Sequence, residues 1–412
     1  MQIMDSDMNR GDMNIVEINT CDYGSTGKIM LQLAVLSRRI GNVIAFSRGW
    51  KHKKKCSSDC SYIGSYIQNG VHHVLSVITG NEGCFSVNGT NRFLSQLDAI
   101  KPDIIHLHNL HGWYINLPLL FNYIKKNNIK VVWTLHDCWA FTGHCPYFTI
   151  AKCDKWKTGC YKCPNYKEYP KSFFDNSKKM YRLKKKWFTG IENLTIVTPS
   201  EWLAGLVKQS FLKDYPVKVI HNGIDLNVFK PTESDFRKEY HISDNKYILL
   251  GVAFGWGKRK GLDVFIELQK RLDKDKYQIV LVGTDDNADK QLPKEIISIH
   301  RTQNQTELAE IYTEADLFVN PTREENYPTV NMESIACGTP VITFRTGGSP
   351  EILTEKTGMV VDCDDVDAMQ NGIEEICEKH LFTSEDCIAQ AKSFDMNKRF
   401  QEYVDLYKEV GE

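Results

Sequence analysis

The chain has 412 residues, of which 42% are hydrophobic and 25% are charged, an ordinary globular composition that is long enough for two domains of about 200 residues each. No run of 18 apolar residues occurs, and the N-terminus lacks the basic and apolar regions of a signal peptide, so we expect a cytoplasmic protein without a membrane-spanning helix. Residues 1–200 hold 26 Lys and Arg against 14 Asp and Glu, whereas the remainder holds 25 against 38. The basic first half favours an anionic partner such as lipid headgroups or phosphates.

Strands and helices are predicted to alternate along the first half of the chain. A helix is expected over 29–40, after the glycine-containing turn 23–27, because apolar residues recur there at helical spacing. Alternation of this kind favours a parallel sheet. The strands are expected at 14–19, 43–46, 103–108, 130–136, 194–198 and 217–220.

The segment His-Asn-Gly-Ile-Asp at 221–225 interrupts this alternation and is interpreted as a linker. Strands resume at 247–253, 277–283, 317–319 and 341–344. The fold class is therefore α/β, with two Rossmann-like domains. We expect an N-terminal domain at 1–220 with a cysteine-rich insertion at 138–165, a C-terminal domain at 221–392, and a helix at 393–412 that crosses back to the first domain.

Two glutamates lie eight positions apart after the strand that ends at Pro321. Glu325 is expected in the loop at the carboxyl end of this strand, and Glu333 on the following helix, which stops at Gly338. Ligands of open α/β sheets bind outside the carboxyl ends of the strands. Carboxylates at that edge suit hydrogen bonding to vicinal hydroxyls, which indicates a sugar ligand.

The block from Glu325 through Glu333 to Cys-Gly-Thr-Pro-Val resembles the E-x7-E signature of the retaining family 4 glycosyltransferases, which have the GT-B fold. The resemblance covers nearly the whole chain, from about Asn14 to Tyr407, and the segment at 221–225 matches the domain junction of the family. It implies two Rossmann-like domains whose parallel sheets face a central cleft, and a nucleotide-sugar donor such as a UDP- or GDP-sugar. A capsular or exopolysaccharide type of enzyme is expected.

Two glycine-containing turns of the second half suit a diphosphate, since glycine amides and basic side chains both bind phosphate oxygens. The first turn is Gly255–Gly261, in which Lys260 matches the phosphate lysine of the family. The family usually has an arginine at the position of Phe254, so Arg259 is expected to supply that charge. The second turn, Gly347-Gly348, resembles the Gly-Gly-x-Pro-Glu element of the family and is expected to present free amides.

In the first half, Gly24 and Gly27 resemble the glycine loop that lines the donor–acceptor cleft of the family, with Lys28 beside them. His136 ends a predicted strand and matches the histidine near the reacting sugar. His108 and His111 form a looser polar cluster on the expected acceptor side.

The resemblance implies His136, Glu325 and Lys260 as catalytic residues. Glu325 would hold the donor's sugar hydroxyls and Glu333 its ribose, while Lys260, Arg259 and the amides of Gly347 and Gly348 stabilise the leaving diphosphate. No Asp-x-Asp segment stands out as a metal-binding motif, so a transfer without a catalytic metal is expected.

Five cysteines fall between residues 138 and 163, and one pair has the Cys-x2-Cys spacing of zinc ligands. We expect a structural zinc ion, with disulfides or unpaired buried thiols as the alternatives. The expected zinc ligands are Cys145, Cys153, Cys160 and Cys163.

A basic stretch with interleaved aromatic residues runs from Phe173 to Phe188, and a second basic loop is Lys51–Lys55. Phe173, Met180, Leu183 and Trp187 share one helical face, which indicates docking to the cytoplasmic face of the inner membrane. The alternative is a helix that packs on the core through this face. Nucleic acid is not expected as a partner, because no recognition motif accompanies the patch.

The resulting hypothesis is a retaining hexosyltransferase that acts on a glycan acceptor, with a polyprenyl-diphosphate-linked acceptor expected. Two alternatives remain: another enzyme of the same fold, such as a nucleotide-sugar epimerase or a sucrose-synthase-like enzyme, and a degenerate scaffold that binds without turnover. The residue at Phe254 is the only support for the scaffold.

Overall fold

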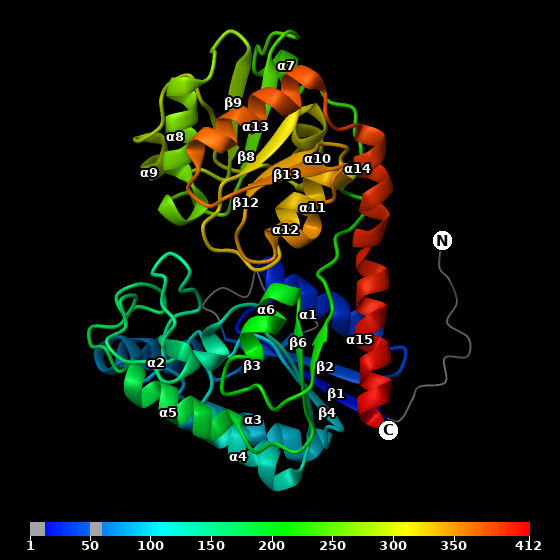
Figure 1. Ribbon diagram of the computed structural model, residues 1–412. Helices are drawn as coiled ribbons and strands as arrows, with labels where there is room; N and C mark the ends of the chain where they lie inside the picture. The colour runs from blue at the N-terminus through cyan, green and yellow to red at the C-terminus, as the bar shows by residue number, and fades with distance from the viewer. Residues whose placement is uncertain (1–12, 50–59) are drawn as a thin grey trace. The chain divides into compact units, whose positions relative to one another are not determined.

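The computed structural model describes residues 13–49 and 60–412, which form two compact units. Unit 1 comprises the described residues up to Ile220 together with Phe400–Glu412, and unit 2 is His221–Arg399. Figure 1 traces the elements from the N-terminus in blue to the C-terminus in red. The basic loop Lys51–Lys55 lies outside the described residues. Within the described ranges, no helix is long and apolar enough to cross a bilayer.

Unit 1 contains a seven-stranded parallel sheet of order β3-β2-β1-β4-β5-β6-β7. The crossovers between its strands are mostly helical, as parallel pairing requires. Its strands are β1 (Met13–Ile18), β2 (Gly41–Arg48), β3 (Cys60–Ile63), β4 (Ile104–Leu107), β5 (Lys130–Thr134), β6 (Leu194–Thr198) and β7 (Val217–Val219). Its helices are α1 (Gly24–Ser37), α2 (Tyr66–Thr79), α3 (Val87–Ile100), α4 (Leu117–Asn127), α5 (Ser177–Phe188) and α6 (Glu201–Val207), with 3-10 turns η2 (Trp139–Phe141) and η3 (Lys155–Lys157).

Unit 2 contains a six-stranded parallel sheet of order β10-β9-β8-β11-β12-β13. Its strands are β8 (Tyr247–Val252), β9 (Tyr277–Val282), β10 (Ile297–Ile299), β11 (Leu317–Asn320), β12 (Val341–Phe344) and β13 (Gly358–Val361). Its helices are α7 (Phe236–Glu239), α8 (Leu262–Arg271), α9 (Asp286–Asp289), α10 (Gln305–Glu314), α11 (Thr329–Ala336), α12 (Ser349–Ile352), α13 (Val366–Lys379) and α14 (Ser384–Ala391), with 3-10 turns η4 (Lys258–Lys260) and η5 (Lys392–Phe394).

Both faces of the unit 2 sheet are buried, which explains the continuous apolar runs of its strands. Alternate residues of a strand point to opposite faces. Ile248 and Leu250 of β8 therefore belong to one apolar cluster, whereas Leu249 belongs to another. In unit 1 a single large cluster includes residues of β1, β4, β5, α4 and α5.

The last helix, α15 (Met396–Gly411), has its first residues in unit 2 and the rest in unit 1. At its start, Ile224 of the predicted linker pairs with Asp395 in a parallel bridge. A Cβ on Gly223 would lie 2.4 Å from the Cα of Met396, so a glycine is needed there. Further along, Tyr403 and Tyr407 are buried and contact His106 within unit 1.

The prediction that the basic stretch docks on a membrane through its apolar face is wrong for α5. In α5, Met180 is 2% exposed and Trp187 is 8% exposed, and both lie in the core cluster of unit 1. The apolar face of α5 therefore packs inward, and four of its five lysines, Lys178, Lys179, Lys185 and Lys186, lie in solvent. Phe173, just before the helix, is by contrast 60% exposed.

Candidate functional site

The predicted donor-binding residues of unit 2 follow the two strands at which the strand order reverses. β9 and β10 lie on one side of β8, and β11, β12 and β13 lie on the other. The loop after β8 carries Arg259 and Lys260, and the loop after β11 carries Glu325. Ligands of open α/β sheets bind at such a switch point, so the topology places these residues where a ligand site is expected.

Lys260 and Glu325 form an ion pair across this switch point. The Lys260 Nζ lies 2.5 Å from the Glu325 Oε2, and the two side chains are 18% and 17% exposed. Burial alone would raise the pKa of Glu325, but the Lys260 ammonium outweighs burial and holds this pKa below its ordinary value. The carboxylate is therefore ionised, and a cation and an anion lie side by side at the edge of the sheet.

Arg323, which the sequence analysis missed, anchors the basic turn. Its guanidinium donates to both carboxylate oxygens of Asp263 at 2.7 and 2.9 Å and to the Lys258 carbonyl at 2.5 Å, and it pairs with Asp364 at 2.5 Å. The Arg323 backbone N–H also donates to the Arg259 carbonyl at 2.9 Å. These bonds join the loop after β11 to the turn after β8, so Arg323 positions the residues on either side of the switch point.

Arg259, which is expected to replace the arginine that the family usually has at the position of Phe254, lies in the same pair of loops. Phe254, which stands at the position of that arginine, is fully exposed. The Arg259 Nη1 donates to the Glu324 carbonyl at 3.3 Å. The structure thus brings Arg259, Lys260 and Glu325 together around two adjacent loops.

The turn Gly347-Gly348 packs against the Glu325 loop. A Cβ on Gly347, whose φ is +55°, would lie 1.9 Å from the Glu325 carbonyl oxygen. The Gly348 N–H donates to the Asn326 carbonyl at 2.6 Å. The expectation of free amides is therefore wrong for Gly348 in this arrangement, because its amide already has a protein partner. The two glycines hold the Glu325 loop in place.

Glu333 lies on α11, where its half-buried carboxylate accepts a hydrogen bond from the Tyr312 hydroxyl of α10 at 3.3 Å. Tyr312 is fully buried. Burial and the neighbouring Glu333 raise the pKa of Tyr312 well above its usual value, so its hydroxyl remains a donor to the carboxylate. The carboxylate of Glu333 is thereby held at a fixed orientation on the helix.

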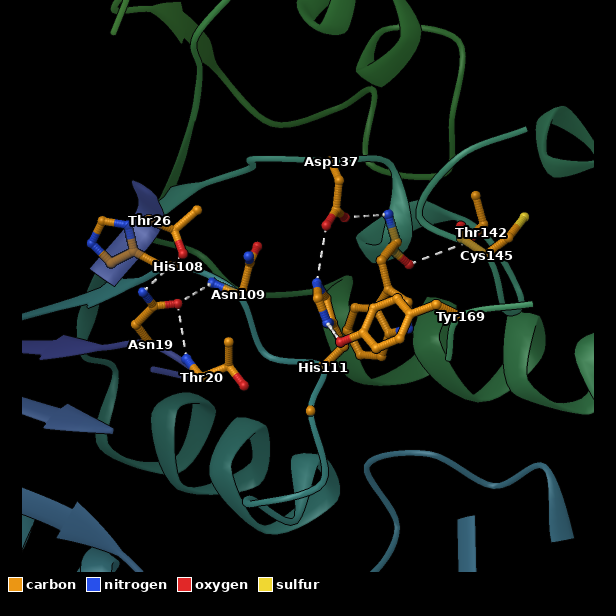
Figure 2. A network of polar contacts seen from close by, with 12 residues as sticks. Asn19, Thr20, Thr26, His108, Asn109, His111, Asp137, Thr142, Cys145 and Tyr169 are labelled. Atoms are coloured by element: carbon orange, nitrogen blue, oxygen red, sulfur yellow. Dashed lines mark hydrogen bonds and ion pairs between the residues drawn. The ribbon is translucent and has the colours of Figure 1, made fainter. Parts of the chain in front are cut away.

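The strand order of unit 1 also reverses, between β1 and β4. Asn19, which directly follows β1, accepts hydrogen bonds from the backbone N–H groups of Thr20 at 2.8 Å and Asn109 at 3.2 Å (Figure 2). Its amide also donates to Thr26 at 3.3 Å. Asn19, which the sequence analysis missed, therefore joins the loops that follow β1 and β4.

The predicted glycine loop of unit 1 is the first turn of α1, which begins at Gly24. A Cβ on Gly27 would lie 2.7 Å from the backbone of Asp22, so only glycine allows the helix to approach the preceding loop this closely. No side chain caps this helix start. Gly24 and Gly27 thus lie at a helix N-terminus beside the switch point of unit 1.

A buried chain of polar groups leads from Glu17 on β1 to His136 after β5. Glu17 Oε2 lies 2.9 Å from His108 Nε2, and His108 Nδ1 lies 3.0 Å from His136 Nε2. Although burial alone would raise it, His106 and His108 lower the pKa of Glu17 to about 2. Burial lowers the pKa of His108 to about 4.

These protonation states fix the direction of the hydrogen bonds. The ionised Glu17 can only accept, so His108 donates from Nε2. The neutral His108 then accepts at Nδ1, and His136 must donate from Nε2. Glu17 thereby selects the tautomer of His136 through His108.

A second network follows β5 and surrounds His111 (Figure 2). His111 Nε2 lies 2.9 Å from Asp137 Oδ2, and His111 Nδ1 lies 2.8 Å from the Tyr169 hydroxyl. Burial opposes protonation, but Asp137 raises the pKa of His111 above its ordinary value. Nearby, the fully buried Lys184 donates to the Trp139 carbonyl at 2.8 Å, and burial lowers the pKa of this lysine to about 7.

The four cysteines predicted to bind zinc line one small cavity beside Trp156. The thiols of Cys145 and Cys163 share a hydrogen bond, and Cys160 accepts one from the Gly143 N–H at 3.1 Å. In the part of the chain that the structure describes, these thiols are not among the groups of three ligand atoms that lie within 4.8 Å of one another. Among the described residues, the groups with three ligand atoms within 4.8 Å of one another are Glu17, His106 and His108, and Asp286, Asp289 and His300.

Family comparisons cover both units. Residues 35–228 match the family model "Glycosyltransferase Family 4", and residues 232–394 match "Glycosyl transferases group 1". The chain is 23% identical to the colanic acid biosynthesis glycosyl transferase WcaC of Escherichia coli (strain K12) over 323 residues, which cover 75% of this chain and 77% of that protein. It is 24% identical to an uncharacterised protein in the cps region of Klebsiella pneumoniae, over 75% of this chain and 79% of that protein.

Solved structures of the GT-B fold match nearly the full length of the chain. Sucrose-phosphate synthase from Thermosynechococcus elongatus has a TM-score of 0.72 at 17% identity and covers 97% of this chain and 99% of its own. HepE from Anabaena, in complex with UDP and glucose, has a TM-score of 0.67 at 13% identity and covers 97% of this chain and 100% of its own. The GT-B fold is confirmed, and the chain belongs to the family 4 glycosyltransferases.

Proposed function

We propose that this glycosyltransferase transfers a hexose from a nucleotide-sugar donor, with retention of the anomeric configuration, to a glycan acceptor. We further propose a polyprenyl-diphosphate-linked acceptor in surface polysaccharide assembly at the cytoplasmic face of the membrane. Similarity to a colanic acid biosynthesis enzyme and to a protein in a cps region supports this assignment. HepE, which is similar in fold and was solved with UDP and glucose, supports a nucleotide-sugar donor.

The observation that carries the proposal is the ion pair of Lys260 and Glu325 at the switch point of unit 2. Without donor, each side chain neutralises the other. A diphosphate offers the Lys260 ammonium a stronger partner, with Arg259 in the adjoining turn. The released Glu325 carboxylate can then accept hydrogen bonds from sugar hydroxyls. Lys260 thus exchanges Glu325 for a phosphate, and Glu325 exchanges Lys260 for sugar hydroxyls. Donor binding therefore leaves neither charge buried without a partner.

Further roles follow from the positions of Glu333 and His136. Glu333, oriented by Tyr312, is assigned to the ribose hydroxyls. His136, whose tautomer is set through His108, is assigned to the donor sugar. Gly347 and Gly348 act indirectly, because they fix the Glu325 loop.

In the proposed reaction, the bond from the anomeric carbon to the diphosphate oxygen breaks. A bond from the same carbon to the acceptor oxygen forms on the same face, and the acceptor's proton passes to the leaving diphosphate. Lys260 and Arg259 stabilise the charge that develops on this leaving group, which is the largest contribution to catalysis in such a scheme.

The test is a transfer assay with UDP- and GDP-sugars and membrane-extracted acceptor lipids, with product detection by mass spectrometry and anomeric assignment by NMR. Lys260→Ala should reduce kcat about a thousandfold if the lysine stabilises the leaving group. Lys270→Ala, an exposed lysine of α8 paired with Glu267, is the matched control and should change nothing. Sugar isomerisation without transfer would support an epimerase instead, and donor binding without any turnover would support a scaffold.

A further inference from the structure

Helix α2 of unit 1 has the reverse of the usual amphipathic arrangement. Its 14 residues contain no Asp, Glu, Lys or Arg. The side chains that it buries are all polar, namely Asn69, His72 and Ser76. Ile67, at 75% exposure, and Val71 and Val74, at 54% each, face solvent instead. A surface helix ordinarily turns its apolar face to the core, so this outward apolar face requires an explanation.

Polar contacts hold α2 in this rotation. His72 Nδ1 lies 2.8 Å from the Ser86 hydroxyl, and the Asn69 amide donates to the carbonyls of Gly49 and Ile63 at 3.4 Å. Ser65 caps the helix start by a reciprocal pair of bonds with Gln68. The helix is therefore anchored through its polar side, and the apolar residues cannot turn inward without loss of these contacts.

A neighbouring segment extends the apolar surface. The Phe173 N–H donates to the Val77 carbonyl at 2.8 Å, and the Asn176 amide donates to the Thr79 carbonyl at 3.2 Å, so residues 172–176 lie along the end of α2. Phe173 and Phe174 are 60% and 64% exposed. Half of the large exposed hydrophobic side chains in the described part of the chain thus gather in one place. We name this surface the α2 face and define it by Tyr66, Ile67, Val71, Val74, Leu75, Ile78, Phe173 and Phe174.

Positive charge borders the α2 face. Residues 152–186 contain 12 Lys and Arg against 3 Asp and Glu. Lys171 directly precedes the segment of Phe173, and Lys178 and Lys179 lie in the first turn of α5, shortly after Asn176. All three lysines are exposed. The one acid between them, Asp175, accepts bonds from the N–H groups of Cys163 and Ser177.

An apolar surface with a cationic border matches the chemistry of an anionic bilayer, which presents hydrocarbon beneath phosphate. A purely apolar protein partner would leave the border of lysines without counter-charge. We propose that the α2 face docks on an anionic lipid bilayer, with its apolar side chains at the boundary between headgroups and acyl chains and the three lysines on lipid phosphates. This differs from the membrane prediction made for α5, whose apolar residues are in the core.

The test is sedimentation of the full-length protein with vesicles of phosphatidylcholine alone or mixed with phosphatidylglycerol. Binding should require phosphatidylglycerol and weaken at high salt. Ile67→Ser should weaken partitioning about tenfold, because one buried aliphatic side chain is lost. Lys178→Gln and Lys179→Gln should each weaken it about fivefold and reduce the salt dependence.

Val74→Ser and Val35→Ser form a matched pair, since both valines are 54% exposed but Val35 lies on α1, outside the α2 face. The first should weaken vesicle binding and the second should leave it unchanged, with thermal unfolding of both close to wild type. Absence of vesicle binding by the wild type, or equal loss in both variants, would overturn the proposal. Self-association that Val74→Ser abolishes, without lipid binding, would assign the α2 face to a second copy of the chain and overturn it as well.

This inference does not depend on the proposed reaction. Vesicle binding is measured without donor or turnover, and nucleotide binding by unit 2 is measured without lipid. Absence of vesicle binding would leave the proposed reaction standing, and absence of nucleotide binding would leave the membrane docking of the α2 face standing.

Discussion

Arg323 is predicted to hold the basic turn of unit 2 in its binding conformation, and Arg323→Ala tests this directly. The side chain is only 9% exposed and makes four contacts to the turn and its surroundings. Its carboxylate partners are 51% and 62% exposed, so water replaces much of what they lose. We therefore expect a loss of about 1 kcal/mol from the Lys258 carbonyl bond and about 1 kcal/mol from the two carboxylates together.

A loss of about 2 kcal/mol corresponds to a fall of about 4 to 8 °C in the melting temperature of a unit of this size. The assay is differential scanning fluorimetry of the full-length variant, combined with hydrogen exchange of the turn at 257–261. Arg323→Lys should recover only part of the loss, because an ammonium cannot make the paired bonds to Asp263.

The matched control is Arg345→Ala in the same unit. Arg345 pairs with Asp362 at 3.0 Å, but these side chains are 61% and 79% exposed, so the pair should contribute less than about 0.5 kcal/mol. Equal melting temperatures for the two variants, with unchanged exchange at 257–261, would refute the anchoring role of Arg323.

Three further predictions concern both units. The pKa of Glu17 is about 2, so its contribution to stability is present above the unfolded value of about 4.3 and is lost as the pH falls toward 2; Glu17→Gln should flatten the acid limb of the unfolding curve of unit 1. Gly347→Ala should lower stability and donor affinity, because its Cβ meets the Glu325 carbonyl, whereas Gly205→Ala, on an open helix position, should be neutral or stabilising in the same melting assay. Zinc bound by the cysteine cluster would appear as about one ion per chain in metal analysis. Cys160→Ser would reduce this content and Cys377→Ser, far along the sequence, would not; protein purified without zinc would contradict the prediction.

The central strands were predictable from the sequence, and several of the outer ones were not. The strands at 194–198 and 341–344 were predicted with their observed bounds, and the other predicted strands differ by a few residues at their ends. The three strands that were missed, β3, β10 and β13, all lie at sheet edges. Such strands are short and lack the continuous apolar run that burial on both faces produces.

The site residues were predicted singly, but their pairing was not. Lys260 and Glu325 are 65 residues apart, and only the adjacency of β8 and β11 brings them together. Arg323 and Glu17 carry no sequence signal that distinguishes them from surface charges. Their roles follow from burial and partners, which depend on the tertiary fold.

Helical periodicity does not distinguish the buried apolar face of α5 from the exposed apolar face of α2. The spacing of Met180 and Trp187 is that of one helix face, yet periodicity alone does not say whether such a face meets the core or a membrane. In α2, the spacing of Ile67, Val71 and Val74 gives the same pattern, and there the face is exposed because Asn69 and His72 anchor the opposite side. The direction of an apolar face is thus decided by the polar contacts on its other side.

The central claim is that unit 2 holds a nucleoside diphosphate with the carboxylate of Glu333 on its ribose. It is tested most directly by isothermal titration of the full-length protein with UDP and with GDP. One of the two should bind to the wild type and equally to Glu375→Ala, an exposed glutamate of α13 that pairs with Lys379. Glu333→Ala should weaken this binding about a hundredfold, as expected for the loss of two charge-assisted hydrogen bonds. Unchanged affinity in a folded Glu333→Ala protein would contradict the account.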